Sequence, residues 1–409
     1  MQTGFVTREP RKIIPYDFVF GFILCCCNCK NTFSQWACEI SGLSGQTLSK
    51  QGLFDRIGQK SVDFAKKALE HVLTVQLNAL QQTTTFFACF NNVFLQDSTT
   101  LCLPETLAWF FAGNTSRGKK KAVARIQTIF NVKCMSFWHF GLGSFTQNDQ
   151  SAAGLILKYL KKGDLVIRDM GYFVLENFRC IMAKDAYFIS RVKFGVSIYD
   201  LEGNELTLKK LLRKKVVKDM RVLIGSKAKL PVRLIMIPLS AKHANEKKRK
   251  ANADRDKRLN HGKYYYKWLE YTIFISNIEN EKWSATQIAN AYKVRWQIEI
   301  IFKSWKSNFN LQKILHEECA NVYRVQINIY LLLMFICLVV QKIYHRYVDR
   351  IESESDKTIS LLKLTNYLVN NLLKALNLNY LRLKEEILRH CCYEKRHDRQ
   401  NIRQLMDLT

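Results

Sequence analysis

The first 80 residues carry apolar side chains at the spacing of helix faces. Apolar residues recur three or four positions apart over 33–43, and a second apolar face follows over 53–57. Thr47 or Ser49, which lie between the two segments, can cap the second helix. We therefore expect residues 1–80 to be helical. Two helices joined by a short glycine-containing turn are compatible with helix-turn-helix DNA binding, and equally with a small helical bundle.

From Thr83 onward the pattern changes to strands and helices in alternation. Thr83–Leu95 is rich in Thr, Phe and Val and leads to Asp97, and Asp164–Asp169 is a short apolar strand with a second acid at its end. A helix over 174–183 and a strand over 187–193 follow. This alternation predicts an α/β core with a partly parallel sheet, in which each acid lies at the tip of a buried strand.

Residues 195–275 have a different, strand-rich pattern. The strand-like runs are 196–201, 205–208, 221–224, 231–239 and 271–276, with a hairpin signal at 202–204. His243–Lys263 contains the basic run 247–250 and no apolar face, so we expect a solvated, mobile arm there.

Helical spacing returns at Ser284 and continues toward the end of the chain. The patterns together divide the chain into four parts. These are a helical N-terminal region for DNA binding (1–80), an α/β core (83–194 and 276–345), a β-rich insertion with a basic arm (195–275) and a helical C-terminal region (346–409).

The charge of the chain restricts the kinds of partner that it is expected to bind. Lys and Arg number 63 against 35 acidic residues, for a formal net charge of +28. Nucleic acid is the commonest partner of such a chain, because neutralising phosphates releases counterions, and an anionic membrane surface is the other candidate. Phe18–Cys27 has no cleavage site after it, and Ile329–Val340 is shorter than the roughly twenty residues that span a bilayer. We therefore expect double-stranded DNA as the partner, with no export and no membrane anchor.

The 13 cysteines point to a reducing compartment, because secreted disulfide frameworks use an even number in shorter chains. Cys25–Cys29 and Cys38 form the one cluster, in which Cys26 and Cys29 have the C-x-x-C spacing of a zinc site. No second ligand pair follows at finger spacing. Small buried side chains on a helix are therefore the favoured interpretation.

The segment from Tyr292 to Lys306 carries the most specific chemistry. On one continuous helix, Tyr292, Arg295, Glu299 and Lys306 fall within roughly 60° of one another. One interpretation is a salt-bridge ladder, in which Glu299 pairs with Arg295 and Lys303. The other is a metal-binding carboxylate beside basic groups that clamp phosphates. The helix alone favours the ladder.

Asp97 and Asp169 favour the metal-binding interpretation over the salt-bridge ladder. An acid at the end of an apolar strand is partly desolvated and needs a partner or a metal ion. Two such acids from neighbouring strands, with Glu299 from a helix, offer oxygen ligands only, which suit Mg²⁺ or Mn²⁺. A pair of these ions can activate an attacking hydroxyl and stabilise the leaving oxygen. A zinc hydrolase is disfavoured, because no His occupies any of the three positions.

These residues resemble the motifs of one large group of bacterial insertion-sequence transposases of the Asp-Asp-Glu (DDE) type. The Y-(2)-R-(3)-E-(6)-K signature of that group is matched by Tyr292, Arg295, Glu299 and Lys306. Asp97-Ser98-Thr99 resembles the first catalytic block, and Asp169-Met170-Gly171-Tyr172 the second. Met170 departs from the group, which often has Arg there, so local substrate contacts are in question.

The resemblance implies a ribonuclease H-like catalytic core interrupted by the β-rich insertion. It implies that Asp97, Asp169 and Glu299 are the catalytic residues and hold two Mg²⁺ or Mn²⁺ ions. It also implies that phosphates at the transposon end are contacted by Tyr292, Arg295 and Lys306. Such enzymes expose a 3′ hydroxyl by hydrolysis, and this hydroxyl then attacks target DNA.

The same resemblance implies a dimer assembled on the DNA, in the cytoplasm of a bacterium and associated with its nucleoid. Two alternatives stay open. One is a catalytically inactive DNA-binding protein derived from a transposase, and the other is a nuclease of the same fold that does not recognise specific ends.

Overall fold

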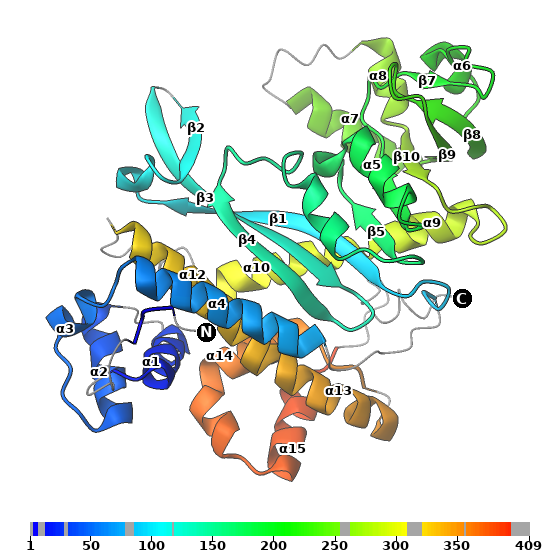
Figure 1. The fold of residues 1–409 in the computed structure, drawn as a ribbon. Coiled ribbons are helices and arrows are strands. Elements are labelled where there is room, and N and C mark those ends of the chain that lie inside the picture. The colour runs from blue at the N-terminus through cyan, green and yellow to red at the C-terminus, as the bar shows by residue number, and fades with distance from the viewer. Residues whose placement is uncertain are drawn as a thin grey trace. The chain divides into compact units, whose positions relative to one another are not determined.

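The computed structural model describes residues 3–6, 13–27, 32–77, 86–116, 118–253, 262–308, 321–355 and 357–393. These residues form two compact units (Figure 1). The first unit draws on residues 1–83, 98–147 and 296–404, and the second on residues 84–97 and 148–295. Both units combine helices with strands, so the expected mixed α/β class is confirmed.

The first unit begins with the expected helices. They are α1 (Pro15–Cys27), α2 (Phe33–Ser44), α3 (Lys50–Phe54) and α4 (Gln59–Leu77). The Ser49 hydroxyl accepts a hydrogen bond from the main-chain nitrogen of Gly52, so of the two expected caps Ser49 is the one that starts α3. Trp36 is buried on α2 and its indole donates to the Phe18 main-chain oxygen at 3.0 Å, which joins α2 to α1.

The cysteine cluster lies partly on this helical region. Cys25 and Cys26 are buried on α1 and form no disulfide with another described cysteine. Cys29 lies outside the described residues. Cys25 and Cys26 are therefore small buried side chains on a helix, as expected, whereas Cys27 at the end of α1 is partly exposed.

The strands of the first unit are residues 98–103 of β1 (Val93–Leu103), β2 (Ala112–Ser116), β3 (Lys119–Asn131) and β4 (Ser136–Ser144), with η1 (Glu105–Leu107) between β1 and β2. The strand β3 pairs antiparallel with both β2 and β4. The later helices are α10 (Trp296–Asn308), α12 (Val322–Phe335), the π-helical segment η4 (Ile336–Gln341), α13 (Lys342–Glu354), α14 (Leu361–Asn377) and α15 (Tyr380–His390). Helix α4 packs along α12 (Figure 1).

The apolar run 329–340 is part of a longer helix than we expected. The continuous helical stretch Val322–Tyr347 has 26 residues and is, among the described residues, the one helix long and apolar enough to cross a membrane. The expectation of a helix too short to span a bilayer is therefore wrong for this segment. Within the protein, 82% of its most apolar window is buried, as in the core helix of a folded unit.

The second unit contains a sheet with strand order β1-β5-β6-β10-β9-β8-β7. Its strands are residues 93–97 of β1, β5 (Leu165–Arg168), β6 (Tyr187–Arg191), β7 (Ile198–Tyr199), β8 (Lys218–Ile224), β9 (Leu230–Pro238) and β10 (Tyr271–Ser276). The β1–β5 and β5–β6 pairs are parallel, and the remaining pairs are antiparallel. The β-rich segment therefore extends the sheet of the second unit, because β10 pairs with both β6 and β9.

Helical segments complete the second unit. They are η2 (Ala153–Lys158), η3 (Met170–Tyr172), α5 (Leu175–Met182), α6 (Leu208–Leu211), α7 (Ala241–Ala253), α8 (Lys263–Trp268) and α9 (Ala285–Lys293). The expected helix over 174–183 is α5 with its two caps. The expected strands ending at Asp169 and starting at Tyr187 are β5 and β6.

The first expected strand is placed differently. The strand β1 begins at Val93, and Phe86, Phe87 and Phe90 lie before it in turns. Their rings pack against Trp283 at centroid distances of 5.0, 5.6 and 4.8 Å, so these apolar residues fill a core contact instead of extending the strand. Asp97 lies inside β1 and not at its tip, because alternating buried residues continue the strand to Leu103.

The basic arm is also different from the expectation. Residues 241–253 form α7, which suits their content of Ala, Lys, Glu and Arg, all strong helix formers. The Lys247 ammonium donates to the Tyr271 main-chain oxygen at 3.1 Å, and Lys248 pairs with Glu270 at 2.6 Å. The described part of the arm is thus a helix anchored to the sheet, and residues 254–261 lie outside the described residues.

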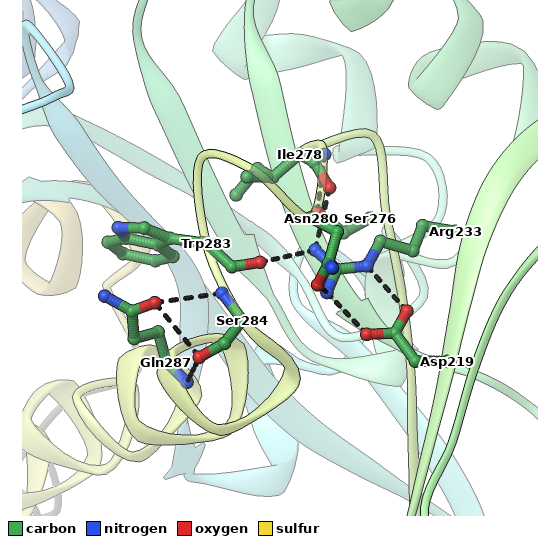
Figure 2. A network of polar contacts seen from close by, with 8 residues as sticks. All are labelled: Asp219, Arg233, Ser276, Ile278, Asn280, Trp283, Ser284 and Gln287. Atoms are coloured by element: carbon green, nitrogen blue, oxygen red, sulfur yellow. Dashed lines mark hydrogen bonds and ion pairs between the residues drawn. The ribbon is translucent and has the colours of Figure 1, made fainter.

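A buried arginine holds the loop that leads into α9 (Figure 2). Arg233 on β9 binds Asp219 through two hydrogen bonds of 2.7 and 2.6 Å. The same guanidinium donates to the main-chain oxygens of Ile278 and Trp283 at 3.0 and 2.6 Å, and to Asn280 at 2.8 Å. Directly after this loop, Ser284 and Gln287 form a capping box that starts α9. The network therefore fixes where α9 begins.

Candidate active site

The pairing of β1 with β5 brings the two aspartates to one edge of the sheet. The last registered pair of these parallel strands is Gln96 with Arg168, and Asp97 and Asp169 follow directly. Because the register is parallel, the next residue of each strand is again level with its neighbour, so the two carboxylates lie side by side where β5 ends and β1 continues. Carboxylate oxygens at such an edge are ligand atoms that suit Mg²⁺ or Mn²⁺.

Gln96 and Arg168, the residues just before the two acids, connect this part of the sheet to the main chain of residues 152 and 153. Gln96 and Arg168 are both buried. The Gln96 amide donates to the Ala152 main-chain oxygen at 2.8 Å, and Arg168 donates to the Ala153 main-chain oxygen at 3.0 Å. Since successive side chains of a strand point to opposite faces, the acids point away from this anchored face.

Asp97 forms an ion pair with the arginine of the expected signature. Arg295 Nη1 donates to Asp97 Oδ2 at 3.0 Å, and the two side chains are only 10% and 14% exposed. A pair this well buried is screened little by water, so removal of either partner leaves a poorly solvated charge. The structure thus joins residues that lie far apart in the sequence.

Asp169 is bound by the tyrosine of the signature. The Tyr292 hydroxyl donates to Asp169 Oδ1 at 3.3 Å, and its ring packs against Phe274 with centroids 5.0 Å apart. Burial raises the pKa of the Tyr292 phenol well above its ordinary value, and the nearby charge of Arg295 opposes this rise. The phenol is therefore a neutral hydrogen-bond donor at physiological pH.

The segment from Tyr292 to Lys306 is not one helix. Helix α9 ends at Lys293 and α10 starts at Trp296. The amides of Val294 and Arg295 donate to the oxygens of Ala291 and Tyr292, three residues back, which tightens the last turn of α9. The expected common face of four residues therefore does not extend across this break.

Glu299 and Lys306 belong to the first unit. Both lie on α10, seven positions apart, and so within about 20° of each other around the helix axis. Burial lowers the pKa of Lys306. The structure thus brings together Asp97, Asp169, Tyr292 and Arg295 within the second unit, and it places Glu299 and Lys306 on one face of α10 in the first.

Arg191 is a residue of this edge that the sequence analysis missed. In the parallel β5–β6 pair Arg168 is opposite Ser190, so Arg191 comes at the level of Asp169. Its charge lowers the pKa of Tyr292, against the rise caused by burial, and lowers that of Lys247, whose pKa is brought to about 8 mainly by burial. Arg191 could have been identified from the sequence, because it lies in the expected strand 187–193, the next strand after Asp164–Asp169.

Gly171 in the second acid block is explained by a close neighbour. A β-carbon at this position would lie 2.8 Å from Asp149 Oδ2, which is closer than real contacts of this kind. A third carboxylate, Asp149, is therefore packed against the turn that follows Asp169. No periodicity or motif in the sequence indicates a role for Asp149.

A family model described as the transposase DDE domain matches residues 89–338. The transposase for insertion sequence element IS231F of Bacillus thuringiensis subsp. israelensis is 26% identical over 325 residues, which cover 73% of this chain and 67% of that protein. The transposase for insertion sequence element IS1151 of Clostridium perfringens is 27% identical over 310 residues, which cover 70% and 65%.

A similar structure is the piggyBac transposase synaptic complex with hairpin DNA, solved by cryo-electron microscopy. It is 11% identical in sequence, with a TM-score of 0.42, and the match covers 95% of this chain and 80% of that chain.

Proposed function

Because the chain belongs to the transposase DDE domain family, we propose that it is an insertion-sequence transposase that cuts and joins DNA strands. The observation that carries the proposal is that Asp97 and Asp169 lie level with each other on neighbouring strands, directly after the paired segments of β1 and β5. The fold we propose for the catalytic region is ribonuclease H-like, and the four-part division of the chain given by the sequence is part of this proposal.

Asp97, Asp169 and Glu299 would hold two Mg²⁺ or Mn²⁺ ions. When bound, such ions activate the attacking hydroxyl and stabilise the leaving oxygen of a phosphodiester. The oxygen-only donor set supports these ions over zinc. Glu299 stands on α10 near the start of the helix, in the first turn, where a carboxylate is favourably placed.

The remaining residues of the edge would position the acids and the DNA. Tyr292 orients Asp169 through its hydroxyl, and Arg295 holds Asp97 in place through an ion pair. Arg295 and Lys306 would bind phosphates of the transposon end. Arg191, on the strand next to β5, would bind phosphates as well. Tyr292 has a neutral phenol with a single proton, so it contributes one hydrogen bond and no charge: it donates to Asp169 in this structure, and would contact a phosphate only in place of that bond.

Double-stranded DNA, both the element's ends and the target, is the proposed partner, and the net charge of +28 supports it. A dimer assembled on DNA, in the bacterial cytoplasm and associated with the nucleoid, belongs to the same proposal. The IS231 and IS1151 relatives come from Bacillus and Clostridium, which favours a bacterial host.

A second candidate is a DNA-binding protein without catalytic activity. The observation in its favour is that both acids are satisfied by protein groups, Asp97 by Arg295 and Asp169 by Tyr292. In that case the four residues act as a structural network that joins α9 to the sheet. A nuclease without recognition of ends is the third possibility.

One assay separates the three. The purified chain is incubated with Mg²⁺ and either a labelled duplex that carries the element's own ends or a scrambled duplex of equal length. A transposase nicks and joins the first duplex and spares the second. Equal cleavage of both indicates a nuclease, and binding without cleavage indicates the inactive DNA-binding protein.

A further inference from the structure

A groove of about 680 Å³ lies between α10 and α14 in the first unit. Lys303 and Ser307 reach it from α10, Lys363, Asn366 and Asn370 from α14, and His390 from the end of α15. These residues lie one or two turns apart on their helices, so each helix turns one polar face to the groove.

The lining of this groove donates hydrogen bonds and carries no carboxylate. Its ionisable side chains are two lysines, one histidine and one tyrosine. A groove of about 610 Å³ in the second unit provides a contrast, because Asp185 and Glu279 are part of its lining. An acid-free lining is thus not simply the result of the chain's basic composition. The groove between α10 and α14 is complementary to an anion.

Glu386, an acid on α15 outside the lining, is already compensated. Glu386 accepts hydrogen bonds from Lys374 at 3.2 Å and from the Tyr367 hydroxyl at 3.1 Å, and His390 lies 4.0 Å from it. Its negative charge therefore opposes an anion in the groove only weakly.

One asparagine of the lining, Asn366, is held with its donor available. The Asn370 amide donates to the main-chain and side-chain oxygens of Asn366 at 2.7 and 3.2 Å. This fixes the orientation of the Asn366 side chain, whose own amide group donates to no described residue. Lys303 is exposed, and among the described residues its ammonium has no ion-pair partner. Both groups can therefore bind a ligand without first breaking a contact.

We propose that this groove binds the phosphate backbone of a DNA strand. The groove follows α10 from Ile300 to Asn308, which is about 12 Å at 1.5 Å per residue. That length corresponds to roughly three phosphates at 3.4 Å per step along one strand of a duplex. Amides, hydroxyls and lysines are the groups that proteins use for contacts to phosphate oxygens. The proposal rests on the proposed function and adds a second DNA-binding face on the helix that carries Glu299.

The first test places a carboxylate in the groove. Asn366→Asp keeps the shape of an exposed side chain and should weaken binding of a labelled end-containing duplex about tenfold or more, measured with chelator present. Asn379→Asp is the matched control, because it adds the same charge to the same unit at the N-cap of α15, where Asp caps as well as Asn. It should change the affinity less than about twofold. Equal effects of the two variants, or no effect of Asn366→Asp, would overturn the proposal.

The second test counts phosphate contacts. The Lys303→Ala, Lys363→Ala double variant should flatten the dependence of log affinity on log salt by about two units. Lys342→Ala, which removes an exposed lysine of α13 outside the groove, should leave the slope as in the wild type. An unchanged slope in the double variant, with a wild-type melting temperature, contradicts the proposal.

The wild-type reaction separates this inference from the proposed function. If the wild type cleaves its ends with Mg²⁺ and the groove variants bind DNA normally, only the groove assignment fails. If the wild type neither binds nor cleaves, both fail. If the variants change the mass of the DNA-free protein in light scattering while DNA affinity stays constant, the groove binds a second copy of the chain, and the DNA assignment is wrong.

Discussion

At the residue scale, the two acids of the sheet edge differ in what holds them. Asp97 pairs with a permanently charged guanidinium, whereas Asp169 accepts a hydrogen bond from a neutral phenol. The first contact contributes mainly electrostatic energy, and the second mainly orientation. Substitutions of Arg295 and Tyr292 should therefore have different consequences.

Arg295→Ala should lower the free energy of unfolding by about 2 kcal/mol, because it leaves Asp97 poorly solvated and without its partner. Asp97→Asn in the same background should recover part of that loss. Both values come from urea denaturation of the four members of a double-mutant cycle. A coupling energy near zero would mean that the ion pair adds nothing to folding.

Tyr292→Phe should keep the fold. Its free energy of unfolding should fall less steeply than that of the wild type as the pH rises above about 10. Burial raises the phenol pKa above its ordinary value of 10.0, so above that pH the unfolded chain ionises while the folded one stays protonated. This group's contribution is complete below about pH 10 and is lost as the pH rises toward the folded pKa. Denaturation midpoints from pH 8 to 11 check this, and parallel curves for wild type and variant would contradict it.

At the element scale, helices and strands could be predicted from the sequence where their caps and lengths depend on residues nearby in the chain. Ser49 and the apolar run before Asp169 gave α3 and β5 correctly. Three features depend on contacts distant in sequence. They are the Phe86–Phe90 turns against Trp283, the break between α9 and α10, and the anchoring of α7 to the sheet.

The same reasoning explains the site. The motif spacing predicted which residues matter, and strand register brought Asp97 and Asp169 to neighbouring positions. Arg191 was missed because its role follows from being level with Asp169 on the next strand. The contacts of Arg295 with Asp97 and of Tyr292 with Asp169 connect parts of the chain that no periodicity relates.

The loop before α9 supplies an element-scale prediction. Arg233→Met should lower stability by about 3 kcal/mol, since it leaves half-buried Asp219 unpaired and frees the loop that starts α9 (Figure 2). Arg221→Met is the matched control on the neighbouring strand, where the exposed pair with Glu279 should be worth less than about 0.5 kcal/mol. Similar losses in both variants, by thermal denaturation, would contradict the assigned role of Arg233.

At the scale of the whole molecule, the net charge and the burial of the longest apolar helix bear on the proposed DNA partner. The helix Val322–Tyr347 is apolar enough for a membrane but is mostly buried within the protein. The charge of +28 is then best explained by DNA. Family membership agrees with this explanation, since the relatives are transposases of insertion sequences.

Metal dependence is a prediction for the whole enzyme. Mg²⁺ or Mn²⁺ should support cleavage, whereas Ca²⁺, which is larger and has looser geometry, should allow DNA binding with little cleavage. Product formation from a labelled duplex, with each ion in turn after chelation, measures this. Robust cleavage in excess chelator would contradict a metal-dependent mechanism.

The central claim is that Asp97, Asp169 and Glu299 act together in DNA cleavage, and one measurement tests it most directly. Asp97→Asn, Asp169→Asn and Glu299→Gln are compared with the wild type for cleavage in Mg²⁺ and for DNA affinity in chelator. We predict that each variant loses cleavage by at least about a thousandfold, while its DNA affinity is unchanged or higher because a negative charge is removed. Wild-type cleavage by any one of the three variants would contradict the claim for that residue.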